Sequence, residues 1–447
     1  MKNKKPNIVF VFADQMRAQA TGYAGDPNVK TPHLDRLAAE TINFTTAVAG
    51  CPVCSPYRAS LLTGQYPLTH GVFVNDVYLN HNAVSLADAF NDAGYDTAYI
   101  GKWHVDGHGR SAYIPKERRQ GFAFWKVLEC THDYNRSPYY GDENKKLFWE
   151  GYDAIAQTRE ALAYIKGRHS ERPFALVLSW GPPHNPYETA PAEFKRLYDP
   201  ERIVLRPNVP EASAAAARKD LAGYYAHISA LDFCVGEIVR AIKERGLEED
   251  TILVFTSDHG DMLGSQGAQR KQRPWDESIL VPFLLRYPSA FGRNAREIRT
   301  PFNAPDIMPT LLGICGIAVP KTVEGLDFSG VLRGEKAPDV EAALIACYHP
   351  FGEWPRMRGG KEYRGVRTER YTYVRDIEGP WLLYDNEKDP YQLGNLSNMP
   401  AHKELQEMLE RMLTRILREQ GDQFLPGETY VKKWSYVTDA TGTVPIR

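Results

Sequence analysis

Short, uninterrupted apolar runs alternate with longer amphipathic segments over the first three quarters of the chain. The runs occupy residues 7–13 (NIVFVFA), 96–100 (DTAYI), 173–180 (PFALVLSW) and 251–256 (TILVFT), and a fifth follows at 281–286. A run that is apolar on both faces is typical of a strand in the interior of a sheet. The pattern therefore predicts five buried strands.

The clearest helix is predicted over residues 220–245, where apolar residues recur in steps of three and four. A second helix is expected to begin at Thr31-Pro32, with the threonine as N-cap. Two more are predicted over residues 84–93 and 152–166. Strands that alternate with helices indicate an α/β fold: a large, mostly parallel sheet sandwiched by helices.

The pattern changes after about residue 340. Residues 363–375 alternate short β-rich segments with basic turns, and a helix is predicted over residues 402–418. We predict an N-terminal α/β domain over residues 1–340, followed by a smaller α+β domain over residues 341–447. The smaller domain would have a short antiparallel sheet and one helix, and its last twenty residues show only an irregular pattern.

Composition and charge exclude several classes of protein. The chain has 447 residues, with 54 basic and 56 acidic side chains, which argues against a surface that binds nucleic acid. Six cysteines are too few for a disulfide scaffold. The apolar run at residues 8–13 is too short for a membrane span or a signal peptide core. We expect a cytoplasmic protein, or a periplasmic or secreted one whose signal peptide was removed, without membrane or nucleic-acid partners.

Polar and ionisable residues follow four of the predicted strands where each run ends. Because ligands bind beyond the carboxyl ends of strands in open α/β sheets, these side chains are expected to lie together. They are Asp14 and Gln15, Lys102 and His104, His184, and Asp258 and His259. Carboxylate and amide oxygens with one imidazole suit Ca²⁺, Mg²⁺ or Mn²⁺ better than a thiolate zinc site would. Lysine and histidine side chains beside such a cation would make a positive pocket that fits phosphate or sulfate.

Cys51 and Cys54 have the spacing of a redox dithiol or of half a zinc site. The second pair that a structural zinc site needs is absent from the sequence. Ser55-Pro56, directly after Cys54, favours the start of a helix. We therefore expect Cys51 to have no chemical role.

Residues 54–64 (CSPYRASLLTG) resemble the sulfatase signature C-x-P-x-R-x-x-x-L-T-G. The segments NIVFVFADQ, GYDTAYIGKWH, SWGPPHNP and SDHGDMLGSQGAQRK resemble further motifs of that family, so the resemblance covers nearly the whole chain. The family is that of the type I sulfatases, in the alkaline phosphatase superfamily. The resemblance implies that a maturation enzyme oxidises Cys54 to formylglycine and that residues 1–340 are the catalytic domain. It also implies hydrolysis of a sulfate ester on a small molecule or saccharide.

The resemblance carries a role to each matching position. The expected ligands of a divalent cation, usually Ca²⁺ in this family, are Asp14, Gln15, modified Cys54, Asp258 and His259. Asp258 is also placed to help deprotonate the attacking hydroxyl.

The other expected catalytic residues bind the substrate or move protons. Lys102 and Lys271 are expected to bind sulfate oxygens, and Arg58 to hold the hydrated aldehyde. His184 is expected to protonate the departing alcohol, either alone or together with Lys271. His104 is expected to accept the last proton when sulfate leaves.

Two positions depart from the common family pattern: Gln15 and His259 stand where many sulfatases have Asp and Asn. With one carboxylate fewer, the site has less negative charge, so Mn²⁺ and Mg²⁺ are alternatives to Ca²⁺ as the bound cation. The same two residue types occur in phosphonate monoester hydrolases, so a phosphonate or phosphate ester hydrolase with the same formylglycine is the alternative. The segment GKWH favours sulfate.

A third class, an anion- or glycan-binding protein in which Cys54 stays a thiol, has no supporting sequence feature. The candidates for sugar contacts lie in polar, aromatic-rich loops: His108, Arg110, His132, Arg136, His349, Arg356 and Arg358. The sequence leaves the oligomeric state open.

Overall fold

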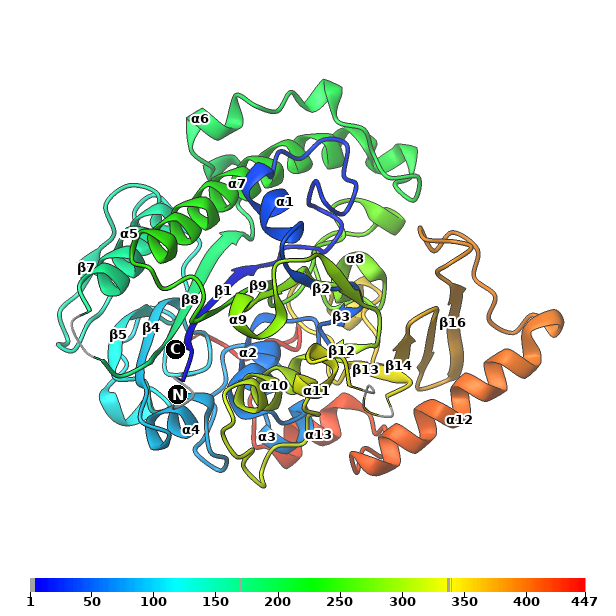
Figure 1. Cartoon of the computed structure of the whole chain (residues 1–447). Helices are drawn as coiled ribbons and strands as arrows, with labels where there is room; N and C mark the ends of the chain where they lie inside the picture. The colour runs from blue at the N-terminus through cyan, green and yellow to red at the C-terminus, as the bar shows by residue number, and fades with distance from the viewer. Residues whose placement is uncertain (1–4, 169–170, 336–337, 339, 447) are drawn as a thin grey trace.

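The computed structural model describes residues 5–168, 171–335, 338 and 340–446. An eight-stranded sheet crosses its centre in the order β11-β2-β10-β9-β1-β8-β4-β5 (Figure 1). Its four inner parallel strands are the predicted apolar runs: β1 (Asn7–Asp14), β4 (Asp96–Lys102), β8 (Phe174–Pro183) and β9 (Thr251–Ser257). The predicted α/β architecture is confirmed.

The remaining strands extend the sheet on both sides. On one side, β5 (Phe124–Leu128) pairs in parallel with β4. On the other side, β10 (Phe283–Arg286) pairs antiparallel with both β9 and β2 (Ile42–Phe44). β11 (Arg296–Ile298) then pairs in parallel with β2 at the edge of the sheet. The fifth predicted strand therefore exists, but it begins after Pro282. Proline has no N–H to donate to a neighbouring strand, which accounts for the later start.

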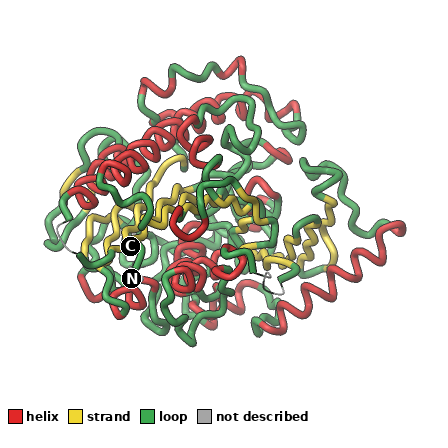
Figure 2. The backbone as a smooth tube through the Cα atoms, viewed as in Figure 1, coloured by secondary structure: helices red, strands yellow, loops and turns green. Residues whose placement is uncertain are grey.

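Helices cover both faces of the sheet, and Figure 2 shows the strands as a central layer between them. One face carries α1 (Pro32–Ala38), α5 (Asp153–Lys166) and α7 (Glu211–Glu244). The opposite face carries α2 (Cys54–Thr63), α4 (Leu86–Asp92) and α10 (Ile307–Ile314). Alternate side chains of β1 point into the two cores, as the period of a strand requires.

Two helix starts differ from the predictions. α7 begins at Glu211, well before residue 220, because residues 211–219 are rich in alanine. Alanine has a high helix propensity but adds little to an amphipathic pattern. Thr31 precedes α1 as expected, yet its hydroxyl donates to the Asp35 carboxylate (2.9 Å) and does not cap a backbone N–H of the helix.

A second, antiparallel sheet follows residue 340. It contains β13 (Ala342–Cys347), β14 (Tyr363–Thr368), β15 (Tyr371–Asp376) and β16 (Gly379–Asp385). The long helix α12 (Lys403–Glu419) packs on it through buried leucines. The α+β character of this region agrees with the sequence analysis, whereas the boundary at residue 340 stays a prediction.

The expectation of an irregular C-terminus is wrong, because α13 (Gly427–Lys433) lies there. Tyr430 and Val431 of this helix are buried in the core on the α2 face of the main sheet. A helix of this length spans too few turns to give a periodic signal in the sequence. In the described ranges, no helix is long and apolar enough to cross a membrane.

One buried ion pair connects the second sheet to the segment that leads into α13. The Arg364 guanidinium pairs with the Asp422 carboxylate and lies over the rings of Tyr348 (4.0 Å) and Phe424 (4.6 Å). Both side chains of the pair are at most 2% exposed. The pair therefore holds the C-terminal segment where its helix can reach the main core.

We expect Asp422→Asn to lower the free energy of unfolding by about 3–5 kcal/mol, because it leaves the Arg364 charge buried and unpaired. Urea unfolding followed by circular dichroism measures this loss. The matched control is Glu410→Gln, which breaks the Arg375–Glu410 pair, whose side chains are 34% and 29% exposed. That change should cost about 1 kcal/mol or less. Equal losses in the free energy of unfolding would show that the buried pair stabilises the fold no more than the exposed pair does.

Candidate active site

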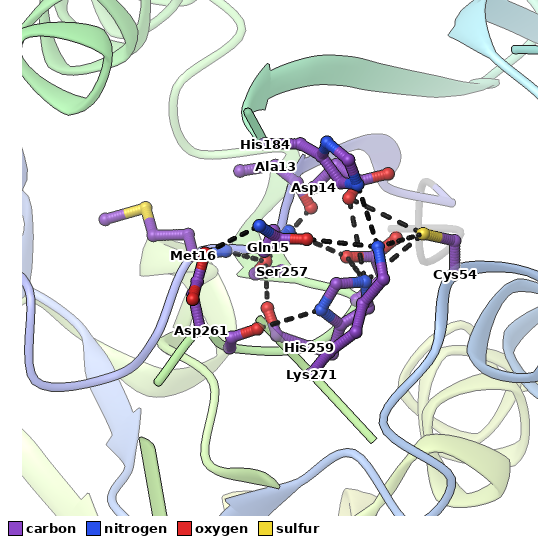
Figure 3. Close-up of polar contacts among 12 residues, drawn as sticks. Ala13, Asp14, Gln15, Met16, Cys54, His184, Ser257, His259, Asp261 and Lys271 are labelled. Carbon is purple, nitrogen blue, oxygen red and sulfur yellow. Dashed lines mark hydrogen bonds and ion pairs between the residues drawn. The ribbon is translucent and has the colours of Figure 1, made fainter. Parts of the chain in front are cut away.

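Four strand ends and one helix start meet at a single edge of the main sheet. β1 ends at Asp14, β4 ends at Lys102, His184 follows β8, and Asp258 follows β9. Cys54 is the first residue of α2, one position earlier than the predicted start at Ser55-Pro56. The topology therefore brings the predicted residues together, as Figure 3 shows for several of them.

The Cys54 sulfur lies among groups of both charges. Its Sγ is 3.2 Å from His259 Nε2, 3.3 Å from Lys271 Nζ, 3.6 Å from Asp14 Oδ1 and 3.9 Å from Lys102 Nζ. Burial, helped by the Asp14 carboxylate, raises the pKa of the Cys54 thiol to about 12. The side chain is therefore a protonated thiol at neutral pH, and a thiol is a far weaker nucleophile than a thiolate.

The donor atoms fit a divalent cation. Ligand atoms of Asp14, Cys54, Asp258 and His259 all lie within 4.8 Å of one another. His259 Nδ1 donates to the Gly260 carbonyl at 2.9 Å, so its Nε2 lone pair faces the carboxylates. Two carboxylates with one neutral imidazole make a set that suits a hard or borderline cation.

Gln15 turns its amide oxygen toward this group. Its backbone has a φ of 70°, its N–H donates to Asp258 Oδ1 (3.0 Å), and its side-chain Nε2 donates to Asp261 Oδ2 (2.6 Å). The amide oxygen is left to accept from Lys271 Nζ at 3.0 Å. Asp261, which also accepts from the Tyr187 hydroxyl, therefore orients Gln15. The sequence analysis did not single out Asp261, although it lies two residues after His259.

Arg58 binds both carboxylates of the site. Its NH2 group donates to Asp14 Oδ2 (3.1 Å) and to Asp258 Oδ2 (3.0 Å), and its NH1 group donates to Ser179 Oγ and to the Lys102 carbonyl. The Arg58 side chain is 1% exposed, and its guanidinium forms buried ion pairs with both carboxylates. Its guanidinium therefore fixes the orientation of the Asp14 and Asp258 carboxylates.

Two ammonium groups define the positive side of the site. Lys102 Nζ pairs with Asp14 Oδ2 at 2.6 Å, and Lys271 Nζ donates to His184 Nε2 at 2.8 Å. Burial opposes ionisation of Asp14, but Lys102 and the other nearby cations outweigh it and hold the pKa of Asp14 well below its usual range. Burial, followed by the Lys271 charge, lowers the pKa of His184 well below its usual range. Neutral His184 can therefore accept from the ammonium.

His184 and His104 are each held by a neighbour that the sequence did not pair with them. The His132 ring stacks on His184 with centroids 4.6 Å apart. His104, two residues after β4, places Nε2 3.3 Å from Asp76 Oδ1, and Arg110 binds the same carboxylate. The site thus contains every predicted side chain, together with Asp76, Arg110, Asp261 and Tyr187 as supporting residues.

Known proteins resemble this chain along nearly its whole length. A family profile described as Sulfatase matches residues 6–317, and one described as N-sulphoglucosamine sulphohydrolase, C-terminal, matches residues 264–419. An ulvan-active sulfatase of Formosa agariphila is 48% identical over 97% of this chain and 85% of its own length. An endo-4-O-sulfatase of Bacteroides thetaiotaomicron is 33% identical over 93% and 92%.

Solved structures agree with this result. A structure from a study of glycosaminoglycan metabolism by Bacteroides thetaiotaomicron superimposes with a TM-score of 0.86 and 31% identity. The match covers 96% of this chain and 99% of that one.

We expect Asp261→Asn to weaken binding of Ca²⁺ or Mn²⁺ by about 10–100-fold, the usual effect of losing a residue that orients a metal ligand. The new amide can present its own N–H groups to Gln15 Nε2, which turns the Gln15 oxygen away from the site. Calorimetric titration of metal-free protein measures the affinity. Asp306→Asn is the control, because Asp306 is also buried but its carboxylate accepts from the N–H groups of Asn303 and Leu326, away from these residues. Unchanged affinity in the Asp261 variant would rule out Gln15 as an oriented ligand.

Proposed function

The chain belongs to the sulfatase family and hydrolyses sulfate esters. From that premise we propose that its substrate is a sulfated saccharide. We also propose that its nucleophile is a formylglycine made from Cys54. The names of the two relatives described above support a saccharide, since one is called ulvan-active and the other an endo-4-O-sulfatase. The observation that carries the proposal is the position of Cys54 at the start of α2, between two ammonium groups and two carboxylates.

The state of Cys54 favours modification. As a buried thiol with a pKa of about 12 it would attack sulfur poorly, and a sulfur-bound sulfate would have no easy exit. A hydrated formylglycine supplies one hydroxyl that attacks sulfur and another whose later deprotonation releases sulfate. The two hydroxyl oxygens would be bonded to the carbon that carries the Cys54 sulfur in this structure, so they would lie close to the position of that sulfur. A formylglycine-generating enzyme is therefore the expected maturation partner.

The cation would be held by Asp14, Gln15, Asp258 and His259 together with modified residue 54. When bound, it would polarise sulfate oxygens and lower the pKa of an adjacent hydroxyl. We propose Ca²⁺, because oxygen donors predominate, with Mn²⁺ or Mg²⁺ as alternatives that the imidazole of His259 would tolerate. Arg58 would keep the two carboxylates in position.

Lys102 and Lys271 would bind the sulfate oxygens. Their ammonium groups lie 3.9 Å and 3.3 Å from the Cys54 sulfur, so both already face the reacting centre. Fixed positive charges in a buried pocket stabilise developing negative charge without reorganisation, which is a large contribution to catalysis in many enzymes. The pocket is therefore arranged for an anion before the substrate arrives.

Four residues would move protons. Asp258 would help to deprotonate the attacking hydroxyl. Lys271 donates to His184 Nε2, while His184 Nδ1 lies 2.9 Å from the Asn185 carbonyl, so the proton shared by Lys271 and Nε2 would be the one that the departing alcohol receives. His104 would accept the proton of the remaining hydroxyl when sulfate leaves.

The alternative function is a phosphonate or phosphate ester hydrolase on the same scaffold. Gln15 and His259 are compatible with it, but the two relatives named above are both called sulfatases. Comparison of matched aryl sulfates, phosphates and phosphonates measures the preference directly. A higher kcat/KM for a phosphorus ester would favour the alternative.

We also propose that residues 1–340 form the catalytic domain and that residues 341–447 complete its rim. Glu353 of the second region places Oε2 3.9 Å from Lys271 Nζ and Oε1 3.8 Å from Arg270 Nε. A carboxylate at this position can accept hydrogen bonds from sugar hydroxyls next to the leaving group.

Expression with a formylglycine-generating enzyme should change the mass of tryptic peptide 37–58 by loss of sulfur and two hydrogens and gain of one oxygen. Peptide mass spectrometry detects this change, and hydrolysis of an aryl sulfate should appear with it. Cys54→Ala should abolish both. Cys51→Ala is a control within the same peptide and should retain both. Persistence of unmodified Cys54, under conditions that mature a known sulfatase, would exclude this nucleophile.

His184→Ala should reduce kcat/KM by about 10²–10⁴-fold for esters of poorly acidic alcohols, the usual contribution of a general acid. The loss should be much smaller for 4-nitrophenyl sulfate, since nitrophenolate leaves without protonation. Steady-state kinetics on the two ester classes measure the difference. Equal losses on both would mean that His184 acts in another step.

A further inference from the structure

Asp76 lies below the surface and is bound side-on by one guanidinium. Arg110 donates from Nε to Oδ1 at 2.8 Å and from NH2 to Oδ2 at 2.7 Å. The Asp76 side chain is only 7% exposed, so little water competes with this pair. A carboxylate held by two parallel hydrogen bonds from arginine stays ionised, and an ionised carboxylate can only accept hydrogen bonds.

This restriction determines where His104 carries its proton. His104 Nε2 is 3.3 Å from Asp76 Oδ1, so the hydrogen of this contact must be on Nε2. Burial lowers the pKa of His104 to about 3, which leaves the ring neutral with a single N–H. Nδ1 then has a free lone pair. It is also buried and has no hydrogen-bond partner among the described residues.

The same short segment connects His104 to the start of α2. Asn75 Oδ1 accepts from the backbone N–H of Ser55 at 3.1 Å, and Ser55 Oγ donates to the His104 carbonyl at 2.6 Å. His104 has a φ of 60°, a left-handed conformation that is costly for a residue with a side chain. Ser55 therefore holds the backbone of His104, and Asp76, next to Asn75, holds its ring.

We propose that Asp76 is a positioning residue which, fixed by Arg110, holds His104 as the Nε2–H tautomer and so makes Nδ1 the proton acceptor of the site. The inference rests on the proposed function. Nδ1 takes the proton of the remaining hydroxyl of residue 54, and the electron pair of the broken O–H bond stays on oxygen. That pair re-forms the carbonyl, the carbon–oxygen bond to sulfate breaks, and sulfate leaves with its bonding pair. The Asp76 carboxylate then faces an imidazolium, whose charge it stabilises.

Asp76→Asn is the direct test. The new amide can donate to Nε2, which favours the Nδ1–H tautomer and removes the free lone pair from Nδ1. We expect kcat for an aryl sulfate to fall by about 10²–10⁴-fold, as when a general base is lost or is held in the wrong tautomer. KM should not rise, since Asp76 binds no sulfate oxygen in the proposed site. The phenol should appear as a burst of one equivalent before slow turnover, because only release of sulfate is impaired.

A second measurement is independent of activity and of maturation. In protein labelled with ¹⁵N-histidine and carrying unmodified Cys54, NMR reports which ring nitrogen of each histidine is protonated. The His104 signals, assigned with a His104→Gln variant, should show Nε2–H in the wild type and Nδ1–H in Asp76→Asn. If the wild type shows this tautomer but has no sulfatase activity, the proposed function fails while the tautomer assignment stands.

The chain contains a matched control. Asp106 is a buried carboxylate that binds Arg118 through both oxygens and lies 3.3 Å from the half-exposed His108. Asp106→Asn repeats the same chemical change beside another arginine and histidine, and it should leave kcat within a few fold of the wild type. A wild-type kcat in Asp76→Asn, or an unchanged His104 tautomer, would overturn the proposal. So would an equal loss of kcat in the Asp106 variant.

Discussion

Two completely buried carboxylates lie side by side in this protein, and the surrounding site depends on how their charges are balanced. Asp14 ends β1 and Asp258 follows β9, and these neighbouring parallel strands bring both to one edge. Buried like charges repel strongly at low dielectric, so neither position is tolerable without cations. One NH2 group of Arg58 binds both, and Lys102 binds Asp14 as well. A bound divalent cation would add to this balance from the open side.

This balance of charge also sets the protonation of the histidines. Because ammonium and guanidinium groups already occupy the site, a further positive charge is unfavourable and burial keeps the rings neutral. The pKa of His184 and that of His259 both lie below their usual range, with burial as the main cause. Neutral rings can accept protons or bind a metal, which charged rings cannot do. The Lys271 charge acts in the same direction as burial on both rings.

The second sheet contributes to the site as well as to stability. Its core includes Val48 and Leu280 from the larger region, so the two sheets share buried side chains. The buried pair of Arg364 and Asp422 and the inserted helix α13 extend this contact to the far end of the chain. Glu353 is thereby held beside Lys271 at the rim. Packing therefore fixes the segment that carries Glu353 against the larger region.

Much of the fold could be predicted because its signals are local. Apolar runs marked the inner strands, strand ends marked Asp14, Lys102, His184 and Asp258, and the segment around Cys54 carried a recognisable signature. The start of α7 and the helix α13 were missed, since an alanine-rich turn and a two-turn helix leave no periodic pattern. Pro282 shortened a predicted strand for a reason that the apolar pattern alone does not report.

The sequence by itself determined which chemical groups the protein brings to the edge of the sheet, because strand order and covalent adjacency place them there. Only the tertiary structure decided how each group is held. Gln15 is oriented by Asp261 and bound to Asp258, 243 residues away, and Arg58 binds both carboxylates. His104 obtains its tautomer from Asp76 and Arg110. Hydrogen-bond partners are chosen by geometry within a few ångströms, and residues distant in sequence meet at that scale only after the chain has folded.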